Sequence, residues 1–568
     1  MTEALRLTWV QPEDLIGHEL RQAAADGRDA SAVAAAWRAA GGPPPPPMAG
    51  ASPVPAAPAL RALATRLLDA LAELPSPLAP LEPTDLPAIR AACPSWPRRG
   101  ADPARPARRA AHDGPADPAD GSPPGTGHGD RSPGHPGPGG TDGSPDPDPG
   151  PGPGPAHPGP AHPGPAHPGT PDRPDAHPPR SGPDPDPDPG PGPAHPGTPD
   201  RPDAHPSQGA PAPGEPDGYE RALHAAWLGR AVGCLLGKPV EKLPLPAIRA
   251  LARATGNWPL TTWFTARGLP PELARAHPWN RRSATTSLAE NIDGMPEDDD
   301  LDYPVLNLLL LQRYGHGFRT ADVARLWLDE LPAGRTFTAE RIAFRNLLSG
   351  IEPPYTARHH NPFREWIGAA IRADVHGWTH PGDPGAAAEA AHRDAVLTHT
   401  ASGVHGAMFI AAVIAAAAGG SHDVHGALAA GLTVVPPRSR LAHAVRSGIG
   451  QARAESDFDT VVDRLHAAYG HLHWVHVLPN AALLAAALTH ADGDFTGSIC
   501  RAVSGGWDTD SNGATAGSIA GLLAARPDAL PDRWTTPLKN RLTTSIADFN
   551  GIGFDSLARL TRLAAARP

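Results

Sequence analysis

Residues 505–521 read Gly-Gly-Trp-Asp-Thr-Asp-Ser-Asn-Gly-Ala-Thr-Ala-Gly-Ser-Ile-Ala-Gly. The two leading glycines predict the end of a helix that begins near Asp494. Small residues then recur at helical spacing, which predicts a second helix over 512–525. Its glycines fall four residues apart, at Gly513, Gly517 and Gly521. They share one helix face, so we expect that face to meet another backbone closely.

The turn between these two helices carries three oxygen-bearing side chains, Asp508, Asp510 and Ser511. An Asp-x-Asp-Ser sequence presents hard oxygen ligands at a spacing used for Mg²⁺ or Ca²⁺. No glutamate follows twelve positions on, which distinguishes the turn from an EF-hand loop. A turn and helix cap without an ion is the alternative interpretation.

A second acidic run, Glu-Asp-Asp-Asp-Leu-Asp at 297–302, precedes an apolar stretch at 305–311. Two carboxylates suffice to cap a helix and complement its dipole. Four adjacent carboxylates repel one another, which is costly unless a cation neutralises them. A solvated helix cap is the alternative for this run taken alone. Together, the two acidic stretches predict a carboxylate metal site on an α-helical enzyme.

Glycines also recur at four-residue intervals further upstream, at Gly229, Gly233 and Gly237. They predict a tightly packed helix face. A membrane-dimer interface of the GxxxG type is disfavoured because Arg230 lies within the stretch. Glu241 follows just past the predicted helix end, on a loop from which its carboxylate can reach into a cleft.

Low-complexity sequence fills residues 99–218, where 37 of the 75 prolines and 24 of the 61 glycines are concentrated. The unit Gly-Pro-Ala-His-Pro recurs at 154–158, 159–163, 164–168 and 192–196. Such sequence has almost no apolar side chains, and proline blocks helix and ladder bonding. We predict a disordered linker with polyproline II character that contacts unknown partners or none. Weak metal binding by its histidines is the alternative.

The linker divides the chain into two predicted helical parts. Residues 1–98 form a small segment, with one helix starting at Pro12 and another over about 59–74. Residues 219–568 form one large helical domain or two fused lobes, without convincing alternation of β-branched residues. The sequence therefore predicts an all-α protein with a small N-terminal segment.

Composition and charge limit the classes of partner and the cellular compartment that we expect. The net charge of −11 and pI of about 6.2 argue against nucleic-acid or anionic-membrane partners. The cysteines form no CxxC pair and indicate free thiols in a reducing compartment: Cys93, Cys234 and Cys500. Charged residues within 1–19 argue against a signal peptide, and the apolar run 407–418 is too short for a membrane span. We expect a cytoplasmic protein.

The stretch at 505–517 resembles the C-terminal metal motif of the ADP-ribosylglycohydrolase family, which includes the dinitrogenase reductase-activating glycohydrolases. The run at 297–302 resembles its N-terminal motif, usually Thr-Asp-Asp-Thr, and 229–241 resembles its opening helix and glutamate loop. The three motifs follow the family's order across roughly 219–565. The resemblance implies a large orthogonal helical bundle that holds two Mg²⁺ ions, or Mn²⁺, between the motifs.

Site residues follow from this resemblance by position. It implies metal binding by Glu297, Asp298, Asp299, Asp508, Asp510 and Ser511. It implies catalytic roles for Glu241, near the scissile bond, and for Asp299. Glu297 and Ser511 replace threonines and Cys234 replaces a common aspartate, which leaves the substrate open.

A glycine-rich stretch at 399–409 resembles the family's loop that approaches ribose and diphosphate. Its backbone N–H groups, leading into a helix expected near Ala407, can cradle phosphate oxygens. The substrate-binding residues implied are His399, Gly403, His405 and Gly406, together with Gly506. For either histidine, a structural role is the alternative.

The predicted activity is Mg²⁺-dependent hydrolysis of the N- or O-glycosidic bond of an ADP-ribosyl group on a protein or small molecule. Three alternatives stay open. The substrate is another ADP-ribose derivative, such as an O-acyl-ADP-ribose; or the protein binds ADP-ribose without turnover; or the linker, as a tether, is the functional part.

Overall fold

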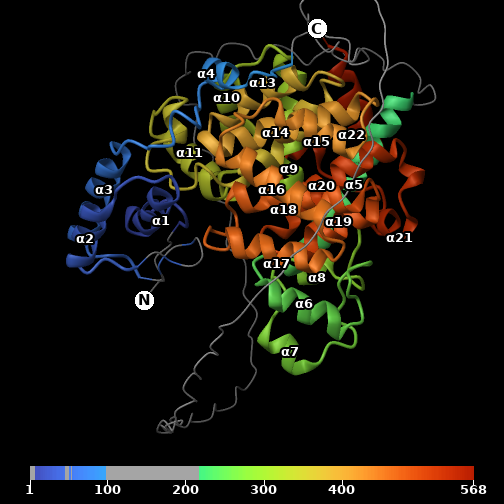
Figure 1. Cartoon of the computed structure of the whole chain (residues 1–568), viewed down its shortest axis with the longest axis horizontal. Helices are drawn as coiled ribbons and strands as arrows, with labels where there is room; N and C mark the ends of the chain where they lie inside the picture. Colours follow the sequence, from blue (N-terminus) through green and yellow to red (C-terminus); the bar gives the residue numbers. More distant parts are fainter. Residues whose placement is uncertain are drawn as a thin grey trace, which may run out of the picture. The chain divides into compact units, whose positions relative to one another are not determined.

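The computed structural model describes residues 7–97, except 45, 47–49, 51 and 53, and residues 217–567. Within these ranges the chain is helical and contains no β-strand; isolated bridges join Met295 to Leu542 and Trp366 to His476. The predicted all-α fold is therefore confirmed (Figure 1). The linker predicted over 99–218 lies outside the described residues except for its last two positions.

The N-terminal segment (residues 7–97) contains α1 (Pro12–Ala25), α2 (Ser31–Ala39), α3 (Pro58–Ala72) and α4 (Leu86–Ala92). Both helices predicted here are present, and each begins with proline in its first turn, where the missing N–H costs nothing. The apolar face of α3 is buried through Leu67, Leu68 and Leu71. These side chains share one hydrophobic cluster with Phe363 and Trp366 from the rest of the protein.

The C-terminal region (residues 217–567) contains the remaining helices. Its α-helices are α5 (Gly218–Gly237), α6 (Leu245–Ala254), α7 (Pro271–Ala276), α8 (Ala284–Ser287), α9 (Asp299–Tyr314), α10 (Thr320–Glu330), α11 (Thr338–Leu348), α12 (Asp374–Trp378), α13 (Pro384–Ala395), α14 (Ala401–Ala418), α15 (Val424–Leu432), α16 (Arg440–Ala454), α17 (Phe458–Tyr469), α18 (Val477–Ala491), α19 (Phe495–Ser504), α20 (Thr509–Ala524), α21 (Asp532–Thr535) and α22 (Phe554–Ala565). The two regions belong to one compact unit.

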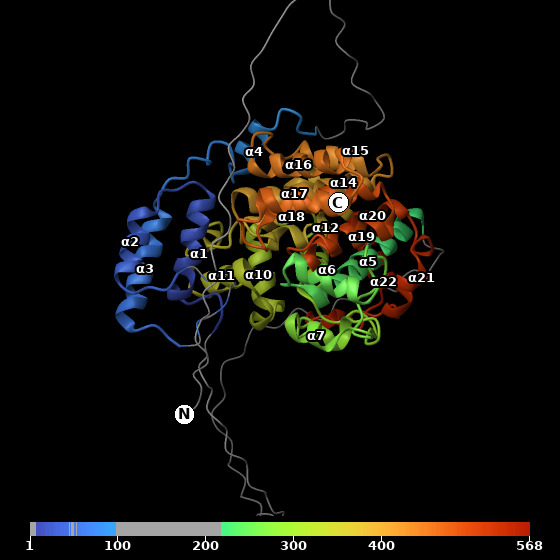
Figure 2. The same ribbon diagram turned by 60° about the horizontal axis from the view of Figure 1, so that its bottom comes forward.

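Helices α5 and α20 pack against each other more extensively than any other two helices of the described residues, and they lie side by side in both views (Figures 1 and 2). Their glycines face each other: a Cβ on Gly233 would come within 3 Å of the Gly513 carbonyl, and one on Gly229 within 3 Å of the Gly517 carbonyl. Only hydrogen fits at such positions. The close backbone approach predicted for both glycine series is confirmed, and each series is the other's partner.

Helix α14 lies in the core. Its composition and length would suit a membrane span, but 89% of the stretch is buried inside the fold, as in the central helix of a packed domain. The expected helix start near Ala407 is wrong, because α14 begins at Ala401. Gly403 and Gly406 are therefore helical, and each allows a close contact. An added Cβ would lie 2.5 Å from the Arg364 carbonyl at Gly403 and 2.5 Å from the Val477 side chain at Gly406.

Candidate metal centre

Three segments far apart in the sequence meet where α5 ends and where α9 and α20 begin. The Thr509 hydroxyl donates to the Gly237 carbonyl at 2.9 Å, which ties the start of α20 to the end of α5. The Ser511 hydroxyl donates to Asp300 Oδ2 at 3.1 Å, which ties α20 to the first turn of α9. The two acidic stretches are thus neighbours.

Asp298 caps α9, since its Oδ1 accepts the Asp300 backbone N–H at 2.9 Å. Cys234, on the last turns of α5, completes a buried group with these two aspartates. One ligand atom from each of the three lies within 4.8 Å of the others, so the group could hold a metal ion. Burial, reinforced by Asp298, raises the pKa of the Cys234 thiol well above its usual value. The carboxylates are therefore the stronger ligands for a hard cation.

Asp508 and Asp510 lie on either side of the start of α20. The helix begins at Thr509 with Asp508 at its N-cap, so the prediction that it starts at Asn512 is wrong. The positive end of the helix favours acids in its first turn, which extends the helix backward. Trp507 precedes the cap with φ of 55° and stacks on His466, with ring centroids 3.8 Å apart.

Asn480 of α18 holds this acidic turn in place. Its Oδ1 accepts the Asp508 backbone N–H at 3.1 Å and the Asn512 side-chain amide at 2.7 Å. Its Nδ2 donates to the Trp474 carbonyl at 2.9 Å and the His476 carbonyl at 2.8 Å. The buried amide therefore uses both of its ends, and sequence reasoning gave no signal for it.

The carboxylates resist ionisation together. Burial, followed by the charge of a neighbouring aspartate, raises the pKa of Asp299, Asp300 and Asp508 well above the usual value. Burial and then Glu241 raise the pKa of Asp510 to about 7. Burial also acts to raise the pKa of Asp298, but the ion pair with Lys238 outweighs it and lowers that pKa.

Negative charge exceeds positive charge at this site. The carboxylates of the site and its ion pairs are Glu241, Asp298, Asp299, Asp300, Asp374, Asp508 and Asp510. The cations paired with them are Arg230, Lys238 and Lys242. Seven carboxylates against three cations leave four excess negative charges at full ionisation, the charge that two divalent cations would neutralise.

Glu241 lies near the aspartates, since its charge contributes to the raised pKa values of Asp299, Asp508 and Asp510. Its predicted catalytic role stays a prediction. Its Oε2 accepts from the Asn280 amide at 2.6 Å, and its Oε1 pairs with Lys242 at 2.6 Å. The side chain is 18% exposed.

Glu297 lies at the edge of the site. Its carboxylate pairs with Arg335 at 3.0 Å and is 25% exposed. It precedes the α9 cap, whereas the buried acids belong to the cap and first turn. Its predicted metal-binding role stays a prediction, and Asp300 is the acid that the structure bonds to Ser511 instead.

The two histidines predicted to bind substrate contact groups other than the acidic side chains described above. His399 Nδ1 lies 2.6 Å from the Thr398 hydroxyl, and His405 Nε2 lies 2.7 Å from the Pro83 carbonyl of the N-terminal segment. Both rings are fully buried. Gly506 has φ of 80°, a conformation that suits glycine, just before the acidic turn. Their predicted roles toward substrate stay predictions.

Comparison with known proteins identifies the family. The protein-family model described as ADP-ribosylglycohydrolase matches residues 215–567. The chain belongs to the ADP-ribosylglycohydrolase family. A search of curated proteins finds no match. A solved structure titled "ADP-ribosylglycohydrolase-related protein complex" is 20% identical and matches 61% of this chain and 97% of its own, with a TM-score of 0.39.

Membership of this family supports a hydrolase that cleaves glycosidic bonds in ADP-ribose derivatives. The family is metal-dependent in general, and the buried group of Cys234, Asp298 and Asp300 is a place where a metal could bind. The acidic motifs singled out in the sequence and the convergence of their side chains therefore agree with the family.

Proposed function

We propose that the protein hydrolyses the glycosidic bond of an ADP-ribosyl group with Mg²⁺ as its cofactor. The observation that carries this proposal is the gathering of seven carboxylates around three cations, which would leave four excess negative charges if all the carboxylates were ionised. Leaving that charge uncompensated in a buried site would be costly. Hard carboxylate oxygens favour Mg²⁺ or Mn²⁺ over softer metals.

The ligands proposed for two ions come from the starts of α9 and α20. They are Asp298, Asp299, Asp300, Asp508, Asp510 and Ser511, with Glu297 at the edge. When bound, the ions supply positive charge that orients ribose hydroxyls and water. The surrounding carboxylates stabilise the positive charge that develops on the ribose carbon as its glycosidic bond breaks.

Glu241 is the proposed general base. Contacts from Asn280 and Lys242 hold both of its oxygens, which fixes the side chain beside the aspartates. In this role one carboxylate oxygen accepts a proton from the attacking water. Positioning of the leaving group is the alternative role for the same carboxylate.

The start of α14 is the proposed contact for the diphosphate of the substrate. Ala401 has φ of 43°, an unusual conformation for a residue with a side chain, directly before the helical turns. The positive end of the helix and the adjacent Arg440 guanidinium suit an anionic group. Gly403 and Gly406 let this helix approach its neighbours closely.

The test replaces Asp508 and Asp510 together by asparagine, which keeps shape and removes charge. Mg²⁺-dependent release of ADP-ribose should fall by at least about a thousandfold, as for loss of a metal that activates the reaction. Asp492→Asn, an exposed carboxylate paired with His425 on the surface, serves as the control. Unchanged release by the double variant would falsify the proposal.

A panel of linkages then separates the candidate substrates: N-glycosides of guanidines, O-glycosides of hydroxyl groups and O-acyl esters. Preference for the ester would favour the O-acyl-ADP-ribose alternative. Binding of ADP-ribose with no turnover of any linkage would favour a binding protein. We also propose a reducing cytoplasmic compartment, since Cys93, Cys234 and Cys500 are buried free thiols.

A further inference from the structure

The N-terminal segment covers the start of α14. The Thr84 hydroxyl accepts the Ala401 backbone N–H at 2.9 Å. The Pro83 carbonyl lies 2.7 Å from His405 Nε2, and the Ser402 hydroxyl donates to Glu82 Oε2 at 3.3 Å. Three consecutive residues of the segment thus contact the donors that the helix start offers.

Glu82 is held as an anion at this position. Its carboxylate accepts the Arg440 backbone N–H at 2.7 Å and the Arg440 guanidinium through Nε at 2.9 Å and Nη2 at 2.6 Å. Burial acts to raise the Glu82 pKa, but these bonds outweigh it and lower that pKa. Arg440 is the first residue of α16, so Glu82 joins the start of α16 to Ser402 at the start of α14. A carboxylate with this set of donors occupies the kind of place that binds phosphate oxygens.

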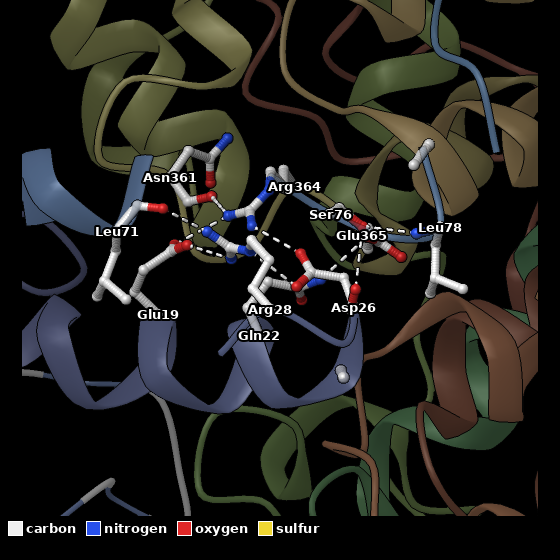
Figure 3. A network of polar contacts seen from close by, with 12 residues as sticks. Glu19, Gln22, Asp26, Arg28, Leu71, Ser76, Leu78, Asn361, Arg364 and Glu365 are labelled. Carbon is white, nitrogen blue, oxygen red and sulfur yellow. Dashed lines mark hydrogen bonds and ion pairs between the residues drawn. The ribbon is translucent and has the colours of Figure 1, made fainter. Parts of the chain in front are cut away.

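A second group of ion pairs joins the two regions nearby (Figure 3). Arg364 of the C-terminal region pairs with Glu19 at 2.8 Å and with Asp26 at 3.1 Å. Arg28 of the N-terminal segment pairs with the same two carboxylates, at 2.7 and 2.8 Å. Figure 3 shows these side chains converging between α1 and the stretch around Arg364. This part of the contact depends on charge.

The contact between the N-terminal segment and the C-terminal region also contains a cavity. A cavity of about 290 Å³ lies among these ion pairs, and both Ala401 and Arg440 line it. The charged walls of this cavity make this part of the contact more polar than the hydrophobic cluster that α1 and α3 share with Phe363 and Trp366. Polar contacts between parts of a chain open more readily than large hydrophobic ones. More than a hundred residues, 98–216, connect the N-terminal segment to α5. An extended chain of that length spans over about 300 Å, so it does not prevent the segment from leaving.

We propose that the N-terminal segment is a tethered competitive inhibitor: Glu82 and Thr84 occupy the donors of Arg440, Ser402 and Ala401, at the starts of α16 and α14, that the substrate diphosphate needs. The proposal rests on the function proposed above. Substrate and segment bind the same groups, so each weakens the apparent affinity for the other. A diphosphate brings more negative charge than Glu82, so a sufficient substrate concentration displaces the segment.

Two variants of the full chain test the competition. Glu82→Gln keeps the shape and removes the charge that pairs with Arg440, and Thr84→Val removes the acceptor for the Ala401 N–H. Weaker docking should lower the KM for the ADP-ribosyl substrate by up to about tenfold in Glu82→Gln and less in Thr84→Val, with kcat unchanged. Asp69→Asn is the matched control, because it removes an exposed ion pair with His360 between the same two regions.

Hydrogen exchange on the wild-type chain gives a second readout. ADP-ribose with Mg²⁺ should speed exchange of the α4 amides, which leave with the segment. An unchanged or higher KM in both variants, or α4 exchange that does not rise, overturns the competition. Absence of turnover in the wild type and every variant overturns the proposed function itself, so the two failures are distinguishable.

Discussion

Asn480 shows how a single uncharged residue can set the geometry of a charged site. It has no metal-ligand chemistry of its own, yet its amide fixes the backbone of Asp508 and the side chain of Asn512. Residues that orient ligands typically change metal affinity by about 10–100-fold when replaced. Asn480 therefore acts on the proposed ions through the acidic turn.

We expect Asn480→Ala to weaken Mg²⁺ binding by about tenfold or more, because the Asp508 N–H loses its acceptor and the turn loosens. Calorimetric titration with Mg²⁺ measures the effect. Asn291→Ala is the control, since that exposed amide donates to the nearby Ala284 carbonyl. Equal affinity in the two variants would show that Asn480 supports the fold and not the metal site.

At the residue scale, the sequence predicted the acids that lie in recognisable motifs. Asp298, Asp299, Asp508 and Asp510 gather as expected, because acids adjacent in sequence stay adjacent at a helix start. Which acid of the 297–300 run turns inward depends on where α9 begins. That boundary places Asp300 inside the site and Glu297 at its edge.

Other site residues had no local signal. Lys238 and Asn480 act through partners 60 and 28 positions away in the sequence. Cys234 joins the aspartates because α5 ends beside them. Such contacts arise from tertiary packing, which spacing along one segment does not encode.

At the element scale, the α5–α20 pair is the support of the metal centre. The glycines bring the two backbones together, and the end of α5 then lies against the start of α20. Any widening of this pair moves Glu241 away from Asp508 and Asp510.

Gly233→Ala should lower the free energy of unfolding by about 3 kcal/mol or more, because the new Cβ overlaps the Gly513 carbonyl and the backbone must move. Gly450→Ala is the matched control: this glycine lies inside α16 with open space around it. Alanine there should raise stability by about 0.5–1 kcal/mol. Urea unfolding measures both, and a similar small effect at Gly233 would contradict the close packing.

Helix starts were less predictable than helix existence. The starts of α14 and α20 lie earlier than expected, at Ala401 and Thr509. A residue with positive φ, a conformation that glycine normally supplies, lies at or near each start: Ala401 is the first residue of α14, and Trp507 directly precedes the N-cap of α20. A pattern of glycines and caps does not reveal such starts, since the surrounding structure imposes the conformation.

At the scale of the whole molecule, composition and periodicity predicted the all-α class, and the family match agrees. The position of the N-terminal segment was not predicted. Its helices bury Leu68 and Leu71 against Phe363 and Trp366, which lie almost three hundred residues later. An amphipathic face shows that a partner exists without identifying the partner.

The free energy of unfolding should depend on pH through the metal centre. The pKa of Asp510 is about 7 in the folded protein and near 3.8 as a free group, so in this range the folded state holds more protons than the unfolded state. Stability in EDTA should therefore fall as pH rises from 6.5 to 8.5, by about 1 kcal/mol from Asp510 alone. The neighbouring aspartates with raised pKa values add to this loss.

The buried histidines change stability in the opposite direction, over a lower range of pH. His18, His380 and His405 have pKa values of about 4, first of all because of burial, against 6.5 when free. Their effect raises stability between pH 4 and 6.5 and is complete above it. The fall above pH 6.5 therefore reports the carboxylates.

Mg²⁺ should reverse this fall, because it binds the ionised carboxylates and its stabilisation grows as protons leave them. Urea unfolding at pH 6.5 and 8.5, in EDTA and in Mg²⁺, measures both effects. The Asp508→Asn, Asp510→Asn double variant should lose the part of the pH dependence that comes from these two carboxylates and most of the gain from Mg²⁺. Wild-type stability that is flat from pH 6.5 to 8.5 in EDTA and indifferent to Mg²⁺ would mean that the buried charge is balanced without a metal.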